Sequence, residues 1–235
     1  MILMKIKSVR NIVFLIVPVL VLLYSCGINQ PSGNEIMDKA FARHGGEYLR
    51  NLEIDFKFRD YKYEAKIVDG EFEFQQRSPV GYNNVSSSGK SRNFSQSDTK
   101  SVFHFALLPY NINDKLAHKE LMCISKIKGE DYYKVEVTFD KNGGGADFED
   151  VYVYWVHKEN YTIDYLAYSF YINGGGVRFR EAYNQREVNG VRFQDYINYT
   201  IDEDYPAQEL DYAFQTGLLR EISRIDLDDI EVIRK

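Results

Sequence analysis

The sequence predicts a mainly β (α+β) protein, in which an antiparallel sheet of about 10 or 11 strands is covered on its dry face by two or three short helices. Three observations predict this class. Runs of alternating polar and apolar residues recur along most of the chain, the turns between them are short, and helical apolar stripes are rare. Links this short join only antiparallel neighbours, because a parallel crossover needs about a dozen residues or more.

Residues 1–25 are expected to be an export signal that is removed. Three basic residues precede an apolar run over residues 12–24, which is too short to span a bilayer, since a span takes about 17 to 25 residues. The run leads into a segment that resembles the lipobox of bacterial lipoproteins, Leu23-Tyr24-Ser25-Cys26-Gly27. That resemblance implies cleavage before Cys26, acylation of its thiol and a lipidated tether over residues 26–33. The alternative is an ordinary secretory leader followed by a chance cysteine.

Residues 34–235 are long enough for one domain with a single core. The full chain carries a net charge of −6, and the leader removes only basic residues, so the mature chain is more acidic still. An acidic surface argues against nucleic acid as a partner. With Cys26 acylated, Cys123 has no partner for an intramolecular disulfide, and its apolar neighbours predict a buried thiol.

The first elements can be placed from local signals. Ser32 and Glu35 match a capping box, and the helix that they begin is predicted to end near His44, whose basic ring suits the negative end of the helix dipole. Strands are predicted over residues 52–59 and 61–67. A two-residue turn at Asp69-Gly70 then places Ile67 opposite Phe72 and Ala65 opposite Phe74.

The middle of the chain alternates loops, helices and strands. Residues 78–100 are predicted to be irregular, and Gly89-Lys90-Ser91 is rejected as a phosphate-binding loop because Asn84 stands where that motif needs glycine. Residues 101–108 are predicted to form a short helix. After this helix, strands are expected over residues 119–128, 133–139, 151–157, 163–172, 177–187, 191–199 and 219–227, and a last helix over residues 207–215.

Two loop questions stay open. The turns around Gly143–Gly145 and Gly174–Gly176 share one end of the predicted meander, where they either flank the mouth of a space between sheet and helices or are ordinary connectors. A two-residue turn at Asn189-Gly190 sends Arg178 and Arg180 to the face of Phe193. A three-residue turn pairs Phe179 with Tyr199 instead and turns both arginines to water, and this second register is favoured because it avoids burying unpaired charge.

No pattern in the sequence predicts catalysis, a metal or a cofactor. The four histidines have no metal-binding spacing, and the Gly-x-Ser-x-Gly motif of serine hydrolases does not occur. The acidic runs at 202–204 and 226–229 are expected to be solvated turns. An enzyme is therefore not predicted.

The chain resembles an uncharacterised family of Gram-negative lipoproteins that is in turn similar to the LolA and LolB lipoprotein carriers. The segments that carry the resemblance are His44-Gly45-Gly46, Phe56-Lys57-Phe58-Arg59, Leu108-Pro109, Trp155, Ile163-Asp164-Tyr165-Leu166-Ala167-Tyr168 and Val177-Arg178-Phe179-Arg180. The resemblance implies a strongly curved sheet, an incomplete barrel whose concave side is plugged by the helices and can hold acyl chains. No catalytic residues come with it.

These observations predict a lipoprotein of the cell envelope, anchored through Cys26 in the outer membrane and facing the periplasm, that binds or carries a hydrophobic or amphiphilic ligand. The residues expected to line the ligand site are Phe56, Phe58, Tyr63, Phe72, Val135, Val137, Arg178, Arg180 and Phe193. The alternative is an interaction lipoprotein with a filled core, whose partners are other envelope proteins.

Overall fold

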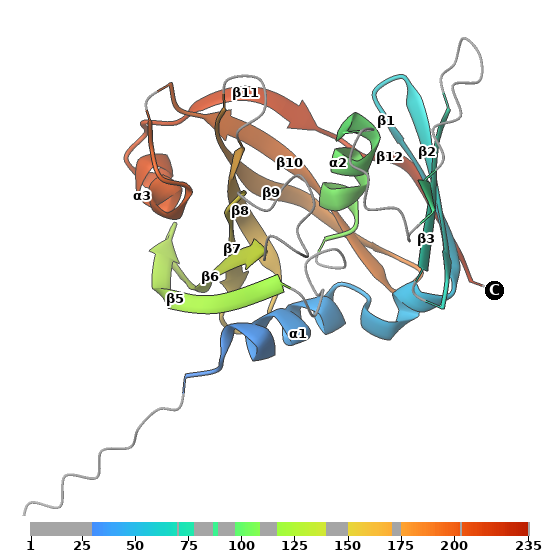
Figure 1. The fold of residues 1–235 in the computed structure, drawn as a ribbon, viewed down its shortest axis with the longest axis horizontal. Coiled ribbons are helices and arrows are strands. Elements are labelled where there is room, and N and C mark those ends of the chain that lie inside the picture. Colours follow the sequence, from blue (N-terminus) through green and yellow to red (C-terminus); the bar gives the residue numbers. More distant parts are fainter. Residues whose placement is uncertain are drawn as a thin grey trace, which may run out of the picture. The chain divides into compact units, whose positions relative to one another are not determined.

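The computed structural model describes residues 30–69, 71–77, 87–88, 97–108, 117–139, 150–170, 175–202 and 204–234. The predicted leader, Cys26 and the loop at Gly143–Gly145 lie outside these residues. The helices and strands, shown in Figure 1, are α1 (Gly33–Arg43), η1 (Gly46–Arg50), β1 (Leu52–Phe58), β2 (Tyr61–Val68), β3 (Glu71–Arg77), β4 (Ser87–Ser88), α2 (Ser97–Ala106), β5 (Ala117–Ile127), β6 (Glu130–Phe139), β7 (Tyr152–His157), β8 (Ile163–Phe170), β9 (Gly176–Val188), β10 (Val191–Thr200), η5 (Ala207–Glu209), α3 (Leu210–Gln215), β11 (Arg220–Ile225) and β12 (Asp228–Arg234).

The larger sheet is a meander of seven antiparallel strands. Its order is β11-β10-β9-β8-β7-β6-β5, so each strand pairs with the strand next to it in the chain. The four strands that the sequence predicts between residues 151 and 199 form its middle. The prediction of a mainly β, antiparallel fold with a few short helices is confirmed.

The smaller sheet has the order β12-β1-β2-β3-β4. Its β2–β3 hairpin has the predicted register, with Ile67 opposite Phe72 and Ala65 opposite Phe74. Strand β12 pairs with β1 and was not predicted, because the sequence analysis ends the last strand at residue 227. The strands of the described residues therefore form two hydrogen-bonded sheets, where the sequence suggested one.

Helix α1 begins with the predicted capping box. The Ser32 hydroxyl accepts a bond from the Glu35 backbone N–H at 3.2 Å, and the Glu35 carboxylate accepts one from the Ser32 N–H at 2.7 Å. The helix then packs tightly on β5, since a Cβ added at Gly33 would lie 2.3 Å from the Lys119 carbonyl oxygen. None of the helices in the described ranges is long and apolar enough to cross a membrane.

Helix α2 lies between the two sheets (Figure 1). From this helix, Phe103 contacts Phe56 of β1 with ring centroids 5.5 Å apart, and Phe105 contacts Tyr196 of β10 at 6.2 Å. These rings belong to one core cluster that also contains the buried side chains of α1. Large apolar side chains of both sheets therefore pack onto α2.

Helix α3 covers the opposite face of the large sheet, which corrects the expectation that all helices cover the same face. A second core cluster forms there, in which Phe179 of β9 contacts Phe214 of α3 at 4.9 Å. The reason is visible in β7, where Tyr154 and Trp155 are both fully buried although neighbouring side chains point to opposite faces. The large sheet therefore has two dry faces.

The β9–β10 hairpin combines the two registers considered from the sequence. Next to Asn189-Gly190 it is a two-residue turn, with Val188 opposite Val191, so the favoured three-residue turn is wrong. A bulge opposite residue 194 then shifts the register, and Phe179 lies opposite Tyr199 as in the second alternative. Asn184 has a φ of 49° at this bulge, a left-handed conformation that asparagine tolerates better than most residues.

Two predictions about single side chains are wrong. Cys123 is exposed rather than buried, because β5 is the outermost strand of the large sheet and a bulge between Leu121 and Cys123 interrupts its alternation. His44 is buried and does not act as a charge at the end of α1. Its Nε2 accepts a hydrogen bond from the Ile163 backbone N–H at 3.2 Å, and burial lowers the pKa of His44 to about 3.

Candidate functional site

The predicted apolar lining residues are packed in the core between the sheets and α2. Phe56 and Tyr63 stack with their ring centroids 5.3 Å apart, and Phe56 also meets Phe103 of α2. The members whose side chains are described and buried are Phe56, Phe58, Tyr63, Val135, Val137 and Phe193. Phe72 is placed only through its backbone, opposite Ile67. These residues come together as predicted, but their side chains fill the space that they enclose.

The two predicted arginines do not face water as the favoured register implied. Arg180 pairs across the sheet with Leu166 and Asn198, on the face that α2 covers, and is only 8% exposed. Arg178 is half-buried and its guanidinium carbon lies 4.8 Å from the centre of the Phe170 ring. Both arginines lie inside because each face of the large sheet is covered, so neither face is free for solvation.

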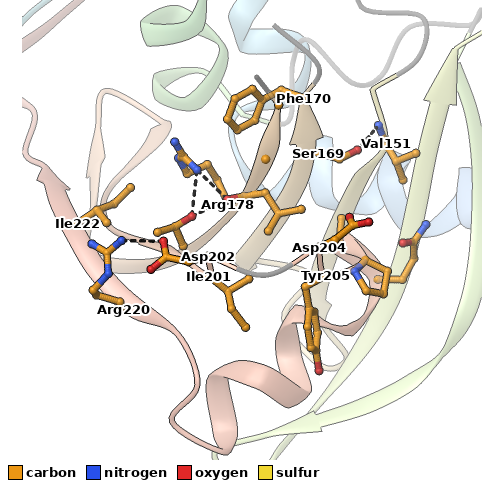
Figure 2. Close-up of a pocket in the computed structure, with 17 residues that line it drawn as sticks. Val151, Ser169, Phe170, Arg178, Ile201, Asp202, Asp204, Tyr205, Arg220 and Ile222 are labelled. Carbon is orange, nitrogen blue, oxygen red and sulfur yellow. Dashed lines mark hydrogen bonds and ion pairs between the residues drawn. The ribbon is translucent and has the colours of Figure 1, made fainter. Parts of the chain in front are cut away.

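A pocket of about 890 Å³ opens at the end of the large sheet where β9 begins (Figure 2). It is lined by the ends of β8, β9, β10 and β11 and by the segment that leads into η5, which includes Tyr205 and Pro206. Gly175 and Gly176 lie in its wall, and the remaining glycine loop of the hypothesis is outside the described residues. Of the predicted site residues, only Arg178 lines this pocket.

The polar groups of the pocket are mostly fixed by other protein groups. Arg178 donates from Nη1 to the Val177 carbonyl oxygen at 2.8 Å and to the Thr200 hydroxyl at 3.0 Å. Arg220 forms an exposed ion pair with Asp202 at 3.0 Å (Figure 2). Apolar surface comes from residues that the sequence analysis did not select, among them Val151, Ile201 and Ile222. These residues come together only because the ends of four strands lie side by side. No local pattern in the sequence predicts that they line one pocket.

A buried polar cluster holds α3, the helix that follows η5, against the large sheet. Asp211 of α3 accepts hydrogen bonds from Lys134 Nζ at 3.0 Å, Trp155 Nε1 at 3.2 Å and Ser125 Oγ at 2.6 Å. Ala207 and Gln208, which immediately precede α3, line the pocket. The Asp211 carboxylate therefore ties α3, which directly follows the pocket-lining η5, to β5, β6 and β7.

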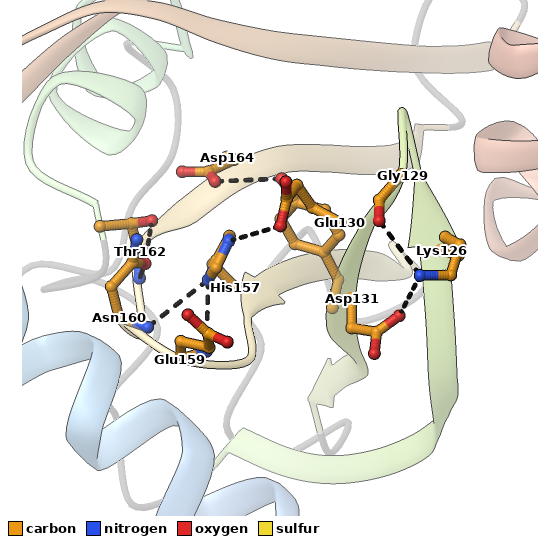
Figure 3. A network of polar contacts seen from close by, with 10 residues as sticks. Lys126, Gly129, Glu130, Asp131, His157, Glu159, Asn160, Thr162 and Asp164 are labelled. Atoms are coloured by element: carbon orange, nitrogen blue, oxygen red, sulfur yellow. Dashed lines mark hydrogen bonds and ion pairs between the residues drawn. The ribbon is translucent and has the colours of Figure 1, made fainter.

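A second polar network stabilises the turn between β7 and β8 (Figure 3). His157 Nδ1 accepts a bond from the Glu159 backbone N–H at 3.2 Å, and the Asn160 side chain accepts one from the Thr162 hydroxyl at 2.7 Å. Burial raises the pKa of Asp164, to which Tyr132 donates at 3.2 Å. These bonds are all made within the protein, which is typical of a structural turn.

Among the residues with described positions, no group of three or more His, Cys, Asp or Glu side chains is arranged to hold a metal ion.

Three solved structures are similar to this chain. A LolA superfamily protein from Nitrosomonas europaea is 14% identical, with 88% of this chain and 95% of that chain covered and a TM-score of 0.43. A DUF1329 family protein from Desulfovibrio piger is 11% identical over 86% and 93% of the chains, with a TM-score of 0.46. A domain named for outer membrane lipoprotein sorting from Vibrio parahaemolyticus is 12% identical over 85% and 92%, with a TM-score of 0.45.

No curated protein matches the sequence. A protein family, described as a family of unknown function (DUF6503), matches residues 80–226. The match covers helices α2 and α3, the whole of the large sheet and, of the small sheet, strand β4. The chain belongs to this family of unknown function, DUF6503.

Proposed function

We propose that this protein is a non-catalytic binding module for an amphiphilic molecule, anchored by an acylated Cys26 in the outer membrane and facing the periplasm. The observation that carries the binding part is the pocket of about 890 Å³ at the end of the large sheet. Pockets that bind small molecules typically enclose about 300 to 1,000 Å³. The size of this pocket suits a ligand with an extended apolar part.

The lining supports an amphiphile over a purely apolar or purely charged ligand. Val151, Val177 and Ile201 offer apolar surface, while the Ser169 hydroxyl and the Arg178 guanidinium offer polar groups. Sites for small molecules commonly combine a mainly apolar lining with a few polar groups that orient the ligand. Both halves of an amphiphile therefore find matching surface in this pocket.

Filling the pocket is expected to weaken binding. Ile222 lines the pocket and is 37% exposed, so tryptophan at this position adds bulk at little cost to folding. In the soluble Cys26→Ser protein, freed of lipid by extraction, we expect Ile222→Trp to weaken binding of the neutral amphiphilic dye N-phenyl-1-naphthylamine at least about tenfold. Fluorescence titration measures this affinity. Ile233→Trp is the matched control, since Ile233 is 51% exposed on β12 and does not line the pocket. Equal affinity for both variants would rule out the pocket as the binding site.

The anchor is expected to depend on Cys26. When bacteria that express the full-length chain are grown with radiolabelled palmitate, the protein should take up the label and Cys26→Ser should not, because the lipobox-like segment places the acyl chains on this thiol. Phosphorimaging of the immunoprecipitated protein measures the label. If the wild-type chain is secreted but takes up no palmitate, the alternative is favoured, in which residues 1–25 are an ordinary secretory leader and Cys26 is not acylated.

A second candidate is an interaction lipoprotein with a filled core. It is favoured by one observation, the complete burial of the predicted lining residues Phe56, Val135 and Phe193 in a packed cluster. Native mass spectrometry of the purified protein separates the two candidates. A lipid that co-purifies supports the binding module, and a ligand-free protein that also fails to bind the dye supports the interaction role.

A further inference from the structure

A guanidinium in the pocket has one edge without a partner. Arg178 donates from Nη1 to the Val177 carbonyl oxygen at 2.8 Å and to the Thr200 hydroxyl at 3.0 Å. Its Nε and Nη2 make no hydrogen bond within the described residues, and no carboxylate there forms an ion pair with it. The Nε and Nη2 groups together form an edge that can bind a carboxylate or a phosphate through two parallel hydrogen bonds.

The Arg178 side chain is held in one position before any ligand binds. Its guanidinium carbon lies 4.8 Å from the centre of the Phe170 ring, close enough for the cation and the ring to attract each other. The Thr200 hydroxyl, which accepts from Arg178, donates in turn to the Val177 carbonyl oxygen at 3.0 Å. An anion that binds here therefore meets a side chain that has already lost most of its conformational freedom.

The pocket also contains a carboxylate without a counter-ion. Of the charged side chains that line the pocket, Arg220 and Asp202 form an ion pair with each other, which leaves Arg178 and Asp204. The Asp204 side chain is exposed and has no ion pair or hydrogen bond in the part of the chain that the structure describes. Asp204 belongs to the segment between β10 and η5, and Arg178 to β9, so the two charges come from different walls of the pocket (Figure 2).

A ligand that carries both charges complements this lining. A purely anionic head group would add negative charge to a pocket that already holds the Asp204 carboxylate, and a purely cationic one would add positive charge beside that of Arg178. We propose that the pocket binds a zwitterionic head group. Its phosphate or carboxylate takes the Nε and Nη2 edge of Arg178, and its ammonium group lies at Asp204. This inference rests on the proposed function and names the chemical class of the ligand.

The test compares four head groups on one chain length. Dodecylphosphocholine is zwitterionic, dodecyl phosphate anionic, dodecyltrimethylammonium cationic and dodecyl maltoside uncharged. Each is titrated below its critical micelle concentration into the delipidated Cys26→Ser protein, and displacement of N-phenyl-1-naphthylamine measures its affinity. We expect dodecylphosphocholine to bind at least about tenfold more tightly than dodecyl maltoside.

Variants at the two charged residues should affect different head groups. Arg178→Met should weaken dodecylphosphocholine and dodecyl phosphate at least about tenfold, because both lose two charge-assisted hydrogen bonds, and should not weaken dodecyltrimethylammonium. Asp204→Asn should weaken dodecylphosphocholine and dodecyltrimethylammonium about threefold, a smaller effect because the carboxylate is exposed, and should not weaken dodecyl phosphate.

Two control variants remove a charge of each sign outside the pocket. Arg224→Gln and Asp229→Asn change exposed residues that pair with Glu221 and Lys57, and neither residue lines the pocket. Both controls should bind the four amphiphiles as the parent protein does. If circular dichroism shows that Arg178→Met does not fold, Arg178→Lys replaces it. Because lysine keeps the charge but not the planar edge, this variant should weaken dodecylphosphocholine at least about threefold and leave dodecyl maltoside unchanged.

The outcomes separate the two proposals. If the parent protein binds all four amphiphiles equally and the variants at Arg178 and Asp204 change nothing, the zwitterion inference is wrong and the binding module stands. If dodecyl phosphate binds most tightly and Asp204→Asn has no effect, the pocket takes an anionic head group and the inference is again wrong. If phosphocholine without a chain displaces the dye as well as dodecylphosphocholine does, the zwitterion site is supported with a small soluble ligand in place of a lipid. If no amphiphile binds the parent protein, both proposals fail.

Discussion

Asp211→Asn is expected to destabilise the protein by about 3 kcal/mol, because it leaves Lys134 buried without its counter-ion. The two side chains are 10% and 11% exposed and their charged atoms lie 3.0 Å apart. Asparagine keeps the shape, and its one amide oxygen can still accept from Trp155 and Ser125. Its NH2 group, a donor, then faces Lys134, so the ammonium loses both its counter-ion and its acceptor. Urea unfolding monitored by circular dichroism measures the change in the free energy of unfolding.

Two controls test the cause of that loss. Asp229→Asn removes an ion pair with Lys57 in which both side chains are more than half exposed, and surface pairs contribute only about 0 to 1 kcal/mol. Adding Lys134→Met to Asp211→Asn should restore most of the lost stability, because replacing a buried pair by apolar groups is often neutral. A double variant whose losses simply add would show that the charge pair is not the cause.

Acid is expected to unfold the protein more steeply than its carboxylates alone would predict, because two buried histidines are neutral in the folded state. Burial lowers the pKa of His44 to about 3 and that of His104 to about 4. In the unfolded chain a histidine binds its proton below about pH 6.5. Between about pH 6 and pH 4 the unfolded state therefore binds more protons than the folded state, and each histidine lowers stability by up to about 1.4 kcal/mol per pH unit as the pH falls.

His44→Gln and His104→Gln separate the two contributions. Glutamine can place an acceptor near the position of the His44 Nε2, which accepts from the Ile163 N–H, and it does not titrate. Urea unfolding at half-unit steps from pH 7 to pH 4 should give a shallower loss for each variant and the shallowest for both together. The same pH slope in the double variant and the parent would exclude the histidines as its source.

Residues close in the chain carried enough information to place most strands. The turn at Asp69-Gly70 sets the β2–β3 register because a two-residue loop leaves one pairing that keeps Ile67 and Phe72 on the same face. Strand β12 was missed because its partner is β1, at the other end of the chain, and its own residues begin with an acidic run. Pairing between distant segments leaves no local signal.

The candidate site was harder to predict than the fold. The apolar residues selected from the sequence do gather on one face, but as packed core, and only Arg178 reaches the pocket. The sequence rule that avoids unpaired buried charge turned Arg180 to water, and the structure places it inside. Such local conflicts tend to occur at functional or strained sites.

By itself, the sequence determined the antiparallel meander, the capped first helix and the register of the first hairpin, because alternation, caps and short turns act over a few residues. Only the tertiary structure decided that both faces of the large sheet are covered, which leaves Arg180 buried, that a bulge at Asn184 shifts the β9–β10 register, and that four strand ends enclose a pocket. Successive side chains of a strand point to opposite faces of the sheet, and alternation in the sequence shows only that the faces differ. Which face is buried, and whether both are, depends on the elements that pack on each face.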